Sequence, residues 1–336
     1  MIALLNCPVI GGSNLGFSMP GAMAIGNSGP LYSFDYLSGL LPSQMTFLRA
    51  SAASYFSSTG ALSSAVVNTP RFDFDPLTLI AMGLHIEQQS TNYLFPSVPA
   101  VTGWGQAFAC NFSDSGTVGP TGAISVRATQ FGTTAGPRVI TPTFTWDGST
   151  GTAVTFYVRR GTSRYLQVGT SAAVSTSCAN FDLDTLTSAI IAGSVSAITK
   201  AQISKISNTT YKISVTFSTN TNPISNNFAV GFANSLASAR NETFTGTTGS
   251  YFDLCLFQVE ASTSSSSYIP TTSAQATRAA DSLSATLPAI GSIYCEYQLN
   301  GSSTITKEVV SISSGILPSN FAGWLRKVSG WNRILS

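Results

Sequence analysis

The chain has 336 residues, with 16 Lys and Arg, 14 Asp and Glu and a single His, so its net charge is only +2. Charged residues make up 9% of the chain and hydrophobic residues 43%, and no basic run could neutralise a track of phosphates, which argues against a nucleic-acid partner. No apolar run reaches the ~20 residues of a membrane-spanning helix, which argues against membrane insertion.

The remaining composition is dominated by Ser, Thr, Gly and Asn, residues that favour strands and turns over exposed helices. It therefore predicts an all-β protein. The five cysteines lie far apart without a CxxC pair, and we expect reduced, buried thiols. The first residues lack a basic region followed by an apolar stretch, so we expect synthesis and assembly in the cytoplasm.

The first two segments contain no long regular element. Residues 1–33 are rich in Gly, Ser, Asn and Pro and follow neither a helical nor a strand period. They predict an extended N-terminal arm that becomes ordered on a neighbouring chain. Residues 34–99 are broken repeatedly by Pro and Gly, which predicts short strands and turns packing on the main domain.

Residues 100–260 alternate with a period of two. In YKISVTFS, Tyr211, Ile213, Val215 and Phe217 share one face, which predicts a half-buried antiparallel strand. The segment YFDLCLFQVE is apolar at both parities and predicts a central strand that is buried on both faces. Two stacked sheets explain both kinds of strand, so this region is predicted to be an antiparallel β-sandwich.

The last two segments are too small to fold alone. Residues 261–281 are rich in Ser and Thr, with Tyr268, Ile269 and Pro270 as one apolar point, and predict a docked linker. Residues 282–336 carry strand-like alternation and form a short C-terminal β segment. Its apolar positions are too many for an exposed hairpin, so we expect it to complete a sheet on the sandwich or on a symmetry-related subunit.

Eight motifs together resemble a family of bacteriophage tail and head appendage proteins with a carbohydrate-binding-module-like domain. The front part matches at TFLRASAASYFSSTGAL (46–62), PRFDFDP (70–76) and GLHIEQQSTNYL (83–94). The rest matches at VTFYVRRGTSRYLQV (154–168), FDLDT (181–185), ISNTTYKISVTFST (206–219), YFDLCLFQVE (251–260) and SYIPTTSAQATRAAD (267–281). The resemblance implies that the sandwich is a jelly roll.

The resemblance also implies a function. It predicts a structural component of a virion, either a tail fibre or appendage or a head decoration protein, assembled in the host cytoplasm. The expected partners are other virion proteins and copies of the chain itself, in a homo-oligomer that is a trimer or another cyclic ring, with the trimer favoured by analogy with phage appendages. The alternative is a glycan-binding adhesin module that attaches the particle to a polysaccharide of the host surface.

Catalytic chemistry has little support in the sequence. His85 has Glu87 nearby but no recognisable Ser or Cys nucleophile. The pairs Asp73/Asp75 and Asp182/Asp184 would place two carboxylates on one face of a strand, but turn roles account for them better, with a calcium site as the alternative. We therefore expect no enzyme activity, no cofactor and no metal.

Two further groups of residues are candidates for structure or binding. Arg49, Arg71 and Arg278 lie in the family-like motifs, where five guanidinium donors can join several carbonyls or carboxylates in a buried network. The resemblance assigns a structural role to these three together with Asp73, Asp75 and Asp281. Glycan binding needs aromatic rings that stack on sugars, and the candidates are Trp104, Trp146, Tyr157, Tyr165 and Tyr211.

Overall fold

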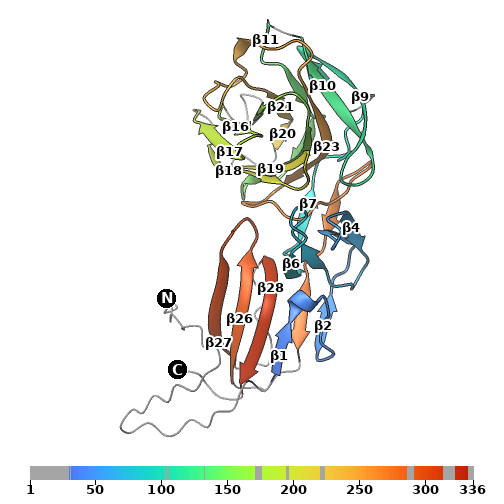
Figure 1. Ribbon diagram of the computed structural model, residues 1–336, viewed down its shortest axis with the longest axis vertical. Helices are drawn as coiled ribbons and strands as arrows, with labels where there is room; N and C mark the ends of the chain where they lie inside the picture. The colour runs from blue at the N-terminus through green and yellow to red at the C-terminus, as the bar shows by residue number, and fades with distance from the viewer. Residues whose placement is uncertain are drawn as a thin grey trace, which may run out of the picture.

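The computed structural model describes most of the chain as β-strands (Figure 1). The residues that it describes are 30, 32–102, 104, 106–131, 133–170, 176–193, 197–219, 224–285, 291–312 and 322–331. Within them one short 3-10 helix, η1 (Tyr36–Ser38), interrupts the strands. Every strand pair is antiparallel, so the predicted all-β antiparallel architecture is confirmed. The arm predicted at residues 1–33 lies almost entirely outside the described residues, apart from the start of β1 at Tyr32.

One end of the elongated molecule is a sandwich of two six-stranded sheets (Figure 1). The first sheet has the order β18-β19-β14-β23-β10-β9, with β18 (Ile198–Lys205), β19 (Thr210–Phe217), β14 (Thr152–Arg160), β23 (Tyr251–Glu260), β10 (Ile124–Gln130) and β9 (Cys110–Val118). The second has the order β17-β16-β15-β21-β12-β8, with β17 (Thr187–Ile191), β16 (Cys178–Asp182), β15 (Tyr165–Thr170), β21 (Phe228–Phe232), β12 (Arg138–Ile140) and β8 (Gln106–Phe108).

The core of the sandwich follows the period of two. Tyr211, Ile213, Val215 and Phe217 of β19 are all nearly inaccessible and belong to one cluster with residues of the facing sheet. Such alternation buries every second side chain because successive strand residues point to opposite faces. The predicted half-buried strand at YKISVTFS is therefore confirmed, and so is the two-sheet sandwich.

Strand β23 is buried on both faces for an identifiable reason. Its pairing with β14 shifts by one residue between Tyr157 and Val158, which marks a bulge. Leu254 and Phe257 consequently both reach the sandwich core, although their parities differ. Cys255 and Leu256 pack instead with a second cluster on the outer face. The apolar run at both parities thus serves two cores, as its pattern predicted.

The other end of the molecule is a third six-stranded sheet (Figure 1). Its order is β27-β26-β28-β6-β5, with β1 also paired to β28. Its strands are β27 (Ile305–Ile312), β26 (Gly291–Leu299), β28 (Gly323–Trp331), β6 (Ala81–Ile86), β5 (Phe72–Phe74) and β1 (Tyr32–Asp35). One core joins the N-terminal segment to the C-terminal segment, since Phe34, Leu84 and Ile86 cluster with Ile293 and Val328.

The partner of the C-terminal segment corrects our expectation. Residues 282–336 were expected to complete a sheet on the sandwich or on another subunit. Instead β28 pairs with β6 and β1, and Leu283 of β25 joins the same core. The physical reason is that both chain ends carry a single apolar face, and burying these two faces against each other removes both from water.

The described residues also form five short two-stranded sheets. Their strands are β2 (Met45–Leu48) with β25 (Ser282–Ala285), β24 (Ala276–Arg278) with β7 (Ser90–Asn92), β3 (Ala53–Phe56) with β4 (Leu62–Ala65), β11 (Thr133–Ala135) with β22 (Thr243–Thr245), and β13 (Phe144–Trp146) with β20 (Ile224–Asn226). Phe56 and Leu62 pack beside the buried Tyr268 on the outer face of the first sheet. Segments 53–65 and 261–281 therefore lie between the sandwich and the third sheet.

Candidate functional site

A buried cluster of charged side chains lies where these segments meet. Arg71, at 0% exposure, donates from Nη1 to Glu87 Oε2 (2.8 Å) and from Nη2 to Asp281 Oδ2 (2.5 Å). Arg49 donates to the other oxygen of Asp281 at 3.1 Å. The carboxylate of Asp281 thus joins two guanidinium groups, and it also accepts the backbone N–H of Glu87 at 2.8 Å. We call Arg49, Arg71, Glu87, Arg278 and Asp281 the charge cluster.

Glu87 is the most heavily bonded member of the charge cluster. Its carboxylate accepts the hydroxyl of Ser267 at 2.6 Å and the backbone N–H of the same residue at 2.8 Å. Burial by itself would raise the pKa of Glu87, but His85, Arg71, Arg278 and the Ser267 hydroxyl outweigh burial and hold this pKa well below its ordinary value. A carboxylate held ionised in this way is unsuited to donate a proton as a general acid.

His85 lies beside the charge cluster between two carboxylates. Its Nδ1 is 3.2 Å from Asp73 Oδ2 and its Nε2 is 3.5 Å from Glu87 Oε1. The ring stacks on Trp324 at 4.9 Å between centroids, and the indole N–H of Trp324 donates to Asp73 at 2.9 Å. The described contacts of the imidazole are carboxylates, an amide and an indole, which is an environment that fixes the ring rather than one that activates a nucleophile.

The predicted structural residues mostly converge at this place. Arg49, Arg71, Arg278 and Asp281 are all buried, and their donors reach carbonyls and carboxylates, as the sequence predicted for the arginines. Asp73 is buried as well and accepts the backbone N–H of Phe56 at 2.6 Å. The three motifs of the front part and the segment 267–281 therefore meet in one network.

The turn role predicted for the paired aspartates is fulfilled by Asp75 and Asp182, whose carboxylates accept backbone N–H groups of the turns that follow them, but it is wrong for Asp73, which lies within β5. Asp75 accepts the backbone N–H groups of Leu77 and Thr78. Asp182 forms a bidentate pair with Arg164, at 3.0 and 2.7 Å, and accepts the N–H of Asp184 at 2.9 Å. The hydrogen bond from Arg164 is the main cause that lowers the pKa of Asp182. Among the described residues no group of three or more His, Cys, Asp or Glu is placed to hold a metal ion.

Four of the five candidate glycan-binding rings are in protein cores. Trp104 and Trp146 are 1% exposed, and their indole N–H groups donate to Pro96 O and Thr152 Oγ1. Tyr157 and Tyr211 are buried as well. A sugar cannot stack on a ring that neighbouring side chains cover, so this prediction is wrong for these four. Tyr165 alone is partly exposed, with the guanidinium of Arg164 over its ring at 4.9 Å.

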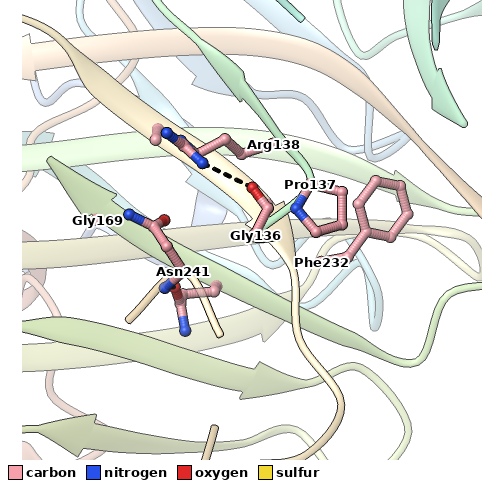
Figure 2. Close-up of a pocket in the computed structure, with 9 residues that line it drawn as sticks. Gly136, Pro137, Arg138, Gly169, Phe232 and Asn241 are labelled. Atoms are coloured by element: carbon pink, nitrogen blue, oxygen red, sulfur yellow. Dashed lines mark hydrogen bonds between the residues drawn. The ribbon is translucent and has the colours of Figure 1, made fainter. Parts of the chain in front are cut away.

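The loop 233–242 packs on the second sheet around Gln167 and Asn180. Gln167 donates to Ala239 O at 3.0 Å and accepts the N–H of Asn241 at 2.8 Å, while Asn180 donates to Ser238 O at 2.7 Å. Figure 2 shows the hollow that remains between Asn241 and Arg138, which donates to Gly136 O at 2.7 Å. Its volume of about 10 Å³ holds one water molecule at most.

A larger hollow lies beside the charge cluster. It has a volume of about 280 Å³ and is lined by residues of segments 87–93 and 260–266 together with Arg278, Asn300 and Ala322. Glu87 and Arg278 of the charge cluster lie at its base. We call this hollow the polar cleft. The sequence did not predict the polar cleft, because Glu260, Asn300 and the serines belong to separate motifs. One signal could have indicated it: Glu87 directly follows the apolar strand β6, and Glu260 ends the apolar strand β23.

The described cysteines are free and buried, as predicted, while Cys7 lies outside the described residues. Burial is the main cause that raises the pKa of the Cys110, Cys178 and Cys255 thiols to about 11 and that of Cys295 to about 12. Thiols with such pKa values are poor nucleophiles at neutral pH. No helix among the described residues has the length and apolar character to cross a membrane.

Comparison with known proteins adds no relative to this description. No protein-family model matches the chain, and no curated protein matches it.

Proposed function

We propose that this chain is a structural component of a bacteriophage particle, a tail fibre or appendage or a head decoration protein, whose main role is protein–protein assembly. The resemblance of its ordered motifs to phage appendage proteins supports this proposal. In it, the sandwich is a jelly roll that projects from the particle, and the third sheet lies toward the particle. The partners are copies of the same chain and neighbouring virion proteins.

The observation that carries the proposal is the distribution of charged and apolar side chains. The whole chain has only 16 Lys and Arg and 14 Asp and Glu. Within the described residues nine of these side chains are buried, namely Arg49, Arg71, Asp73, Glu87, Asp182, Asp253, Glu260, Arg278 and Asp281. Little charge therefore remains on the surface to keep separate copies apart.

Large apolar side chains take the place of those charges on the surface, and many of them lie between residues 40 and 80. They are Leu40, Leu48, Val66, Val67, Leu77, Leu79 and Ile80, each at least 45% exposed. Val66 and Leu48 flank Arg49, whose guanidinium binds the Val66 carbonyl at 2.9 Å. Large exposed apolar side chains on a weakly charged surface are typical of a protein that another protein covers.

Sedimentation velocity over a range of protein concentrations tests this assembly role. We expect the wild-type chain to associate and the variant Val66→Asp/Val67→Asp to shift toward the monomer, because two charges would be buried unpaired in the contact. The matched control is Val118→Asp/Ile124→Asp, an exposed cross-strand pair of the sandwich, and it keeps the wild-type behaviour. A wild-type chain that stays monomeric throughout, and that is absent from purified particles by mass spectrometry, would overturn the proposal.

A further inference from the structure

The polar cleft has the size and the lining of a binding site. Its volume of about 280 Å³ is near the lower end of the range for small-molecule sites, ~300–1,000 Å³. Apart from two alanines, every lining side chain ends in a hydroxyl, an amide, a carboxylate or a guanidinium. Exposed or half-exposed groups such as Gln89, Ser264 and Ser265 face solvent, so a ligand can reach them.

Buried carboxylates hold the walls of the polar cleft in place. Glu260, at 0% exposure, accepts the hydroxyl of Ser90 at 2.6 Å and the backbone N–H of Ser266 at 3.0 Å. Glu87 holds Ser267 on the same segment. Arg278 donates to the Gln88 carbonyl at 2.7 Å. The two walls are thus bonded to a rigid base before any ligand arrives, which lowers the entropy cost of binding.

The charges at the base select against an anionic ligand. In the part of the chain that the structure describes, no Lys, Arg or His lies within ion-pair distance of Glu260, and Lys212 acts on it only from farther away. The single cation of the lining, Arg278, is engaged by Glu87 at 3.5 Å and by the Gln88 carbonyl. An incoming anion would therefore meet the carboxylates of Glu87 and Glu260, and the one cation of the lining is already paired with Glu87.

The groups that face solvent complement hydroxyls. A Ser, Thr or amide side chain both donates and accepts a hydrogen bond, and so does each hydroxyl of a sugar. Tyr93, which is half-buried in the lining, offers an apolar ring surface of the kind that packs on the C–H face of a sugar. We infer that the polar cleft is a binding site for an uncharged polyhydroxylated ligand, a short neutral oligosaccharide.

This site is different from the ring-stacking sites predicted from the sequence. It lies between the sandwich and the third sheet, on segments 87–93 and 260–266, and uses none of the five aromatic residues first considered. It is also independent of the assembly role, because the apolar side chains between residues 40 and 80 contribute nothing to its lining. Either role can fail without the other.

Isothermal titration of the full chain with maltotriose, cellotriose, galactotriose and triacetylchitotriose tests the inference, with spermidine and glucuronate as charged probes. We expect saturable binding of at least one neutral trisaccharide, with a Kd of roughly micromolar to millimolar magnitude. Ser264→Trp fills the cleft from its exposed rim and weakens binding by at least about tenfold, since it excludes the ligand. Gln89→Ala weakens it by about threefold to tenfold, the effect of one hydrogen bond.

Matched controls carry the same changes outside the cleft, at the exposed positions Ser43→Trp and Gln44→Ala, and keep the wild-type affinity. Three outcomes would overturn the inference. They are the absence of binding to all four neutral trisaccharides, equal affinity of the wild type and Ser264→Trp, and preferential binding of spermidine or glucuronate. Sedimentation of the same variants separates a failure of this site from a failure of assembly.

Discussion

Asp281 is the residue on which the charge cluster depends most. Its carboxylate binds Arg49 and Arg71 at once and also accepts a backbone N–H. Removing water from several charges is costly, and only close pairing offsets that cost. Loss of the Asp281 carboxylate would therefore leave the buried Arg49 without its carboxylate partner and Arg71 with Glu87 alone, whereas the loss of an exposed pair changes little.

The variant Asp281→Asn tests this dependence. We expect it to lower the free energy of unfolding by about 3–5 kcal/mol, the cost of breaking a buried ion pair from one side. The same substitution at the half-exposed Asp184, which pairs with Arg160, is the control and should cost about 0–1 kcal/mol. Urea unfolding of both variants measures the difference, and equal losses would contradict a structural role for the cluster.

Glu87 makes the stability of the protein depend on pH. Its pKa in the folded state lies well below the ordinary value of 4.5, so the folded protein binds its proton less tightly than the unfolded chain does. Stability from this group is therefore complete above about pH 4.5 and is lost as the pH falls through the folded pKa. Thermal unfolding between pH 7 and pH 3 should show this loss of stability, and Glu87→Gln should reduce the dependence of the melting temperature on pH. The same pH dependence in wild type and Glu87→Gln would exclude Glu87 as its cause.

Strands β6 and β28 approach each other closely at Gly83. This residue has φ +116°, and a Cβ placed on it would lie 2.3 Å from the carbonyl oxygen of Leu325. A side chain is therefore excluded both by conformation and by the neighbouring strand. The pairing that joins the two chain ends in one sheet depends on this glycine.

Gly83→Ala should consequently destabilise the third sheet. The control is Gly122→Ala, whose φ is +80° but whose Cβ would meet nothing within 4 Å. Both variants carry the conformational strain, so the difference between them reports the contact with Leu325, and we expect it to be about 1–3 kcal/mol. Chemical denaturation followed by tryptophan fluorescence and circular dichroism measures it. Equal effects would mean that β28 can move away from β6 without cost.

At the scale of the whole molecule, one chain makes two folded ends and a junction that connects them (Figure 1). The third sheet needs both chain ends, because its core combines Phe34 and Leu84 with Ile293 and Val328. The charge cluster lies between that core and the sandwich, and it joins β5 and β6 to the segment 267–281. The sandwich has a separate core of its own.

Truncation after Asp281 should therefore affect the two ends differently. It removes β25 to β28 and exposes the apolar face of β1 and β6. We therefore expect binding of a hydrophobic dye and loss of the unfolding transition that belongs to the third sheet. The sandwich should keep its own transition, because its core contains no residue after Val259. Differential scanning calorimetry measures both transitions. A single transition at the wild-type temperature would show that the C-terminal strands are dispensable.

The sequence by itself determined the fold class and the faces of the sandwich strands. Alternation at Tyr211 to Phe217 and the doubly apolar run of β23 are local patterns, and local patterns specify which side chains share a face. A local argument also predicted that Arg49, Arg71 and Arg278 lie in buried networks, because an isolated Arg within a neutral motif needs hydrogen-bond acceptors for its donors.

Only the tertiary structure decided what each face meets. Arg71 and Asp281 are 210 residues apart in the chain, and neither motif contains a pattern that predicts its contact with the other. Long-range contacts also decide three other features. They are the pairing of β28 with β6 and β1, the polar cleft, and the burial of Trp104, Trp146, Tyr157 and Tyr211. A period of two gives the parity of a ring but not whether a second sheet or a loop covers it, because long-range contacts are selected by the combined burial of the whole chain.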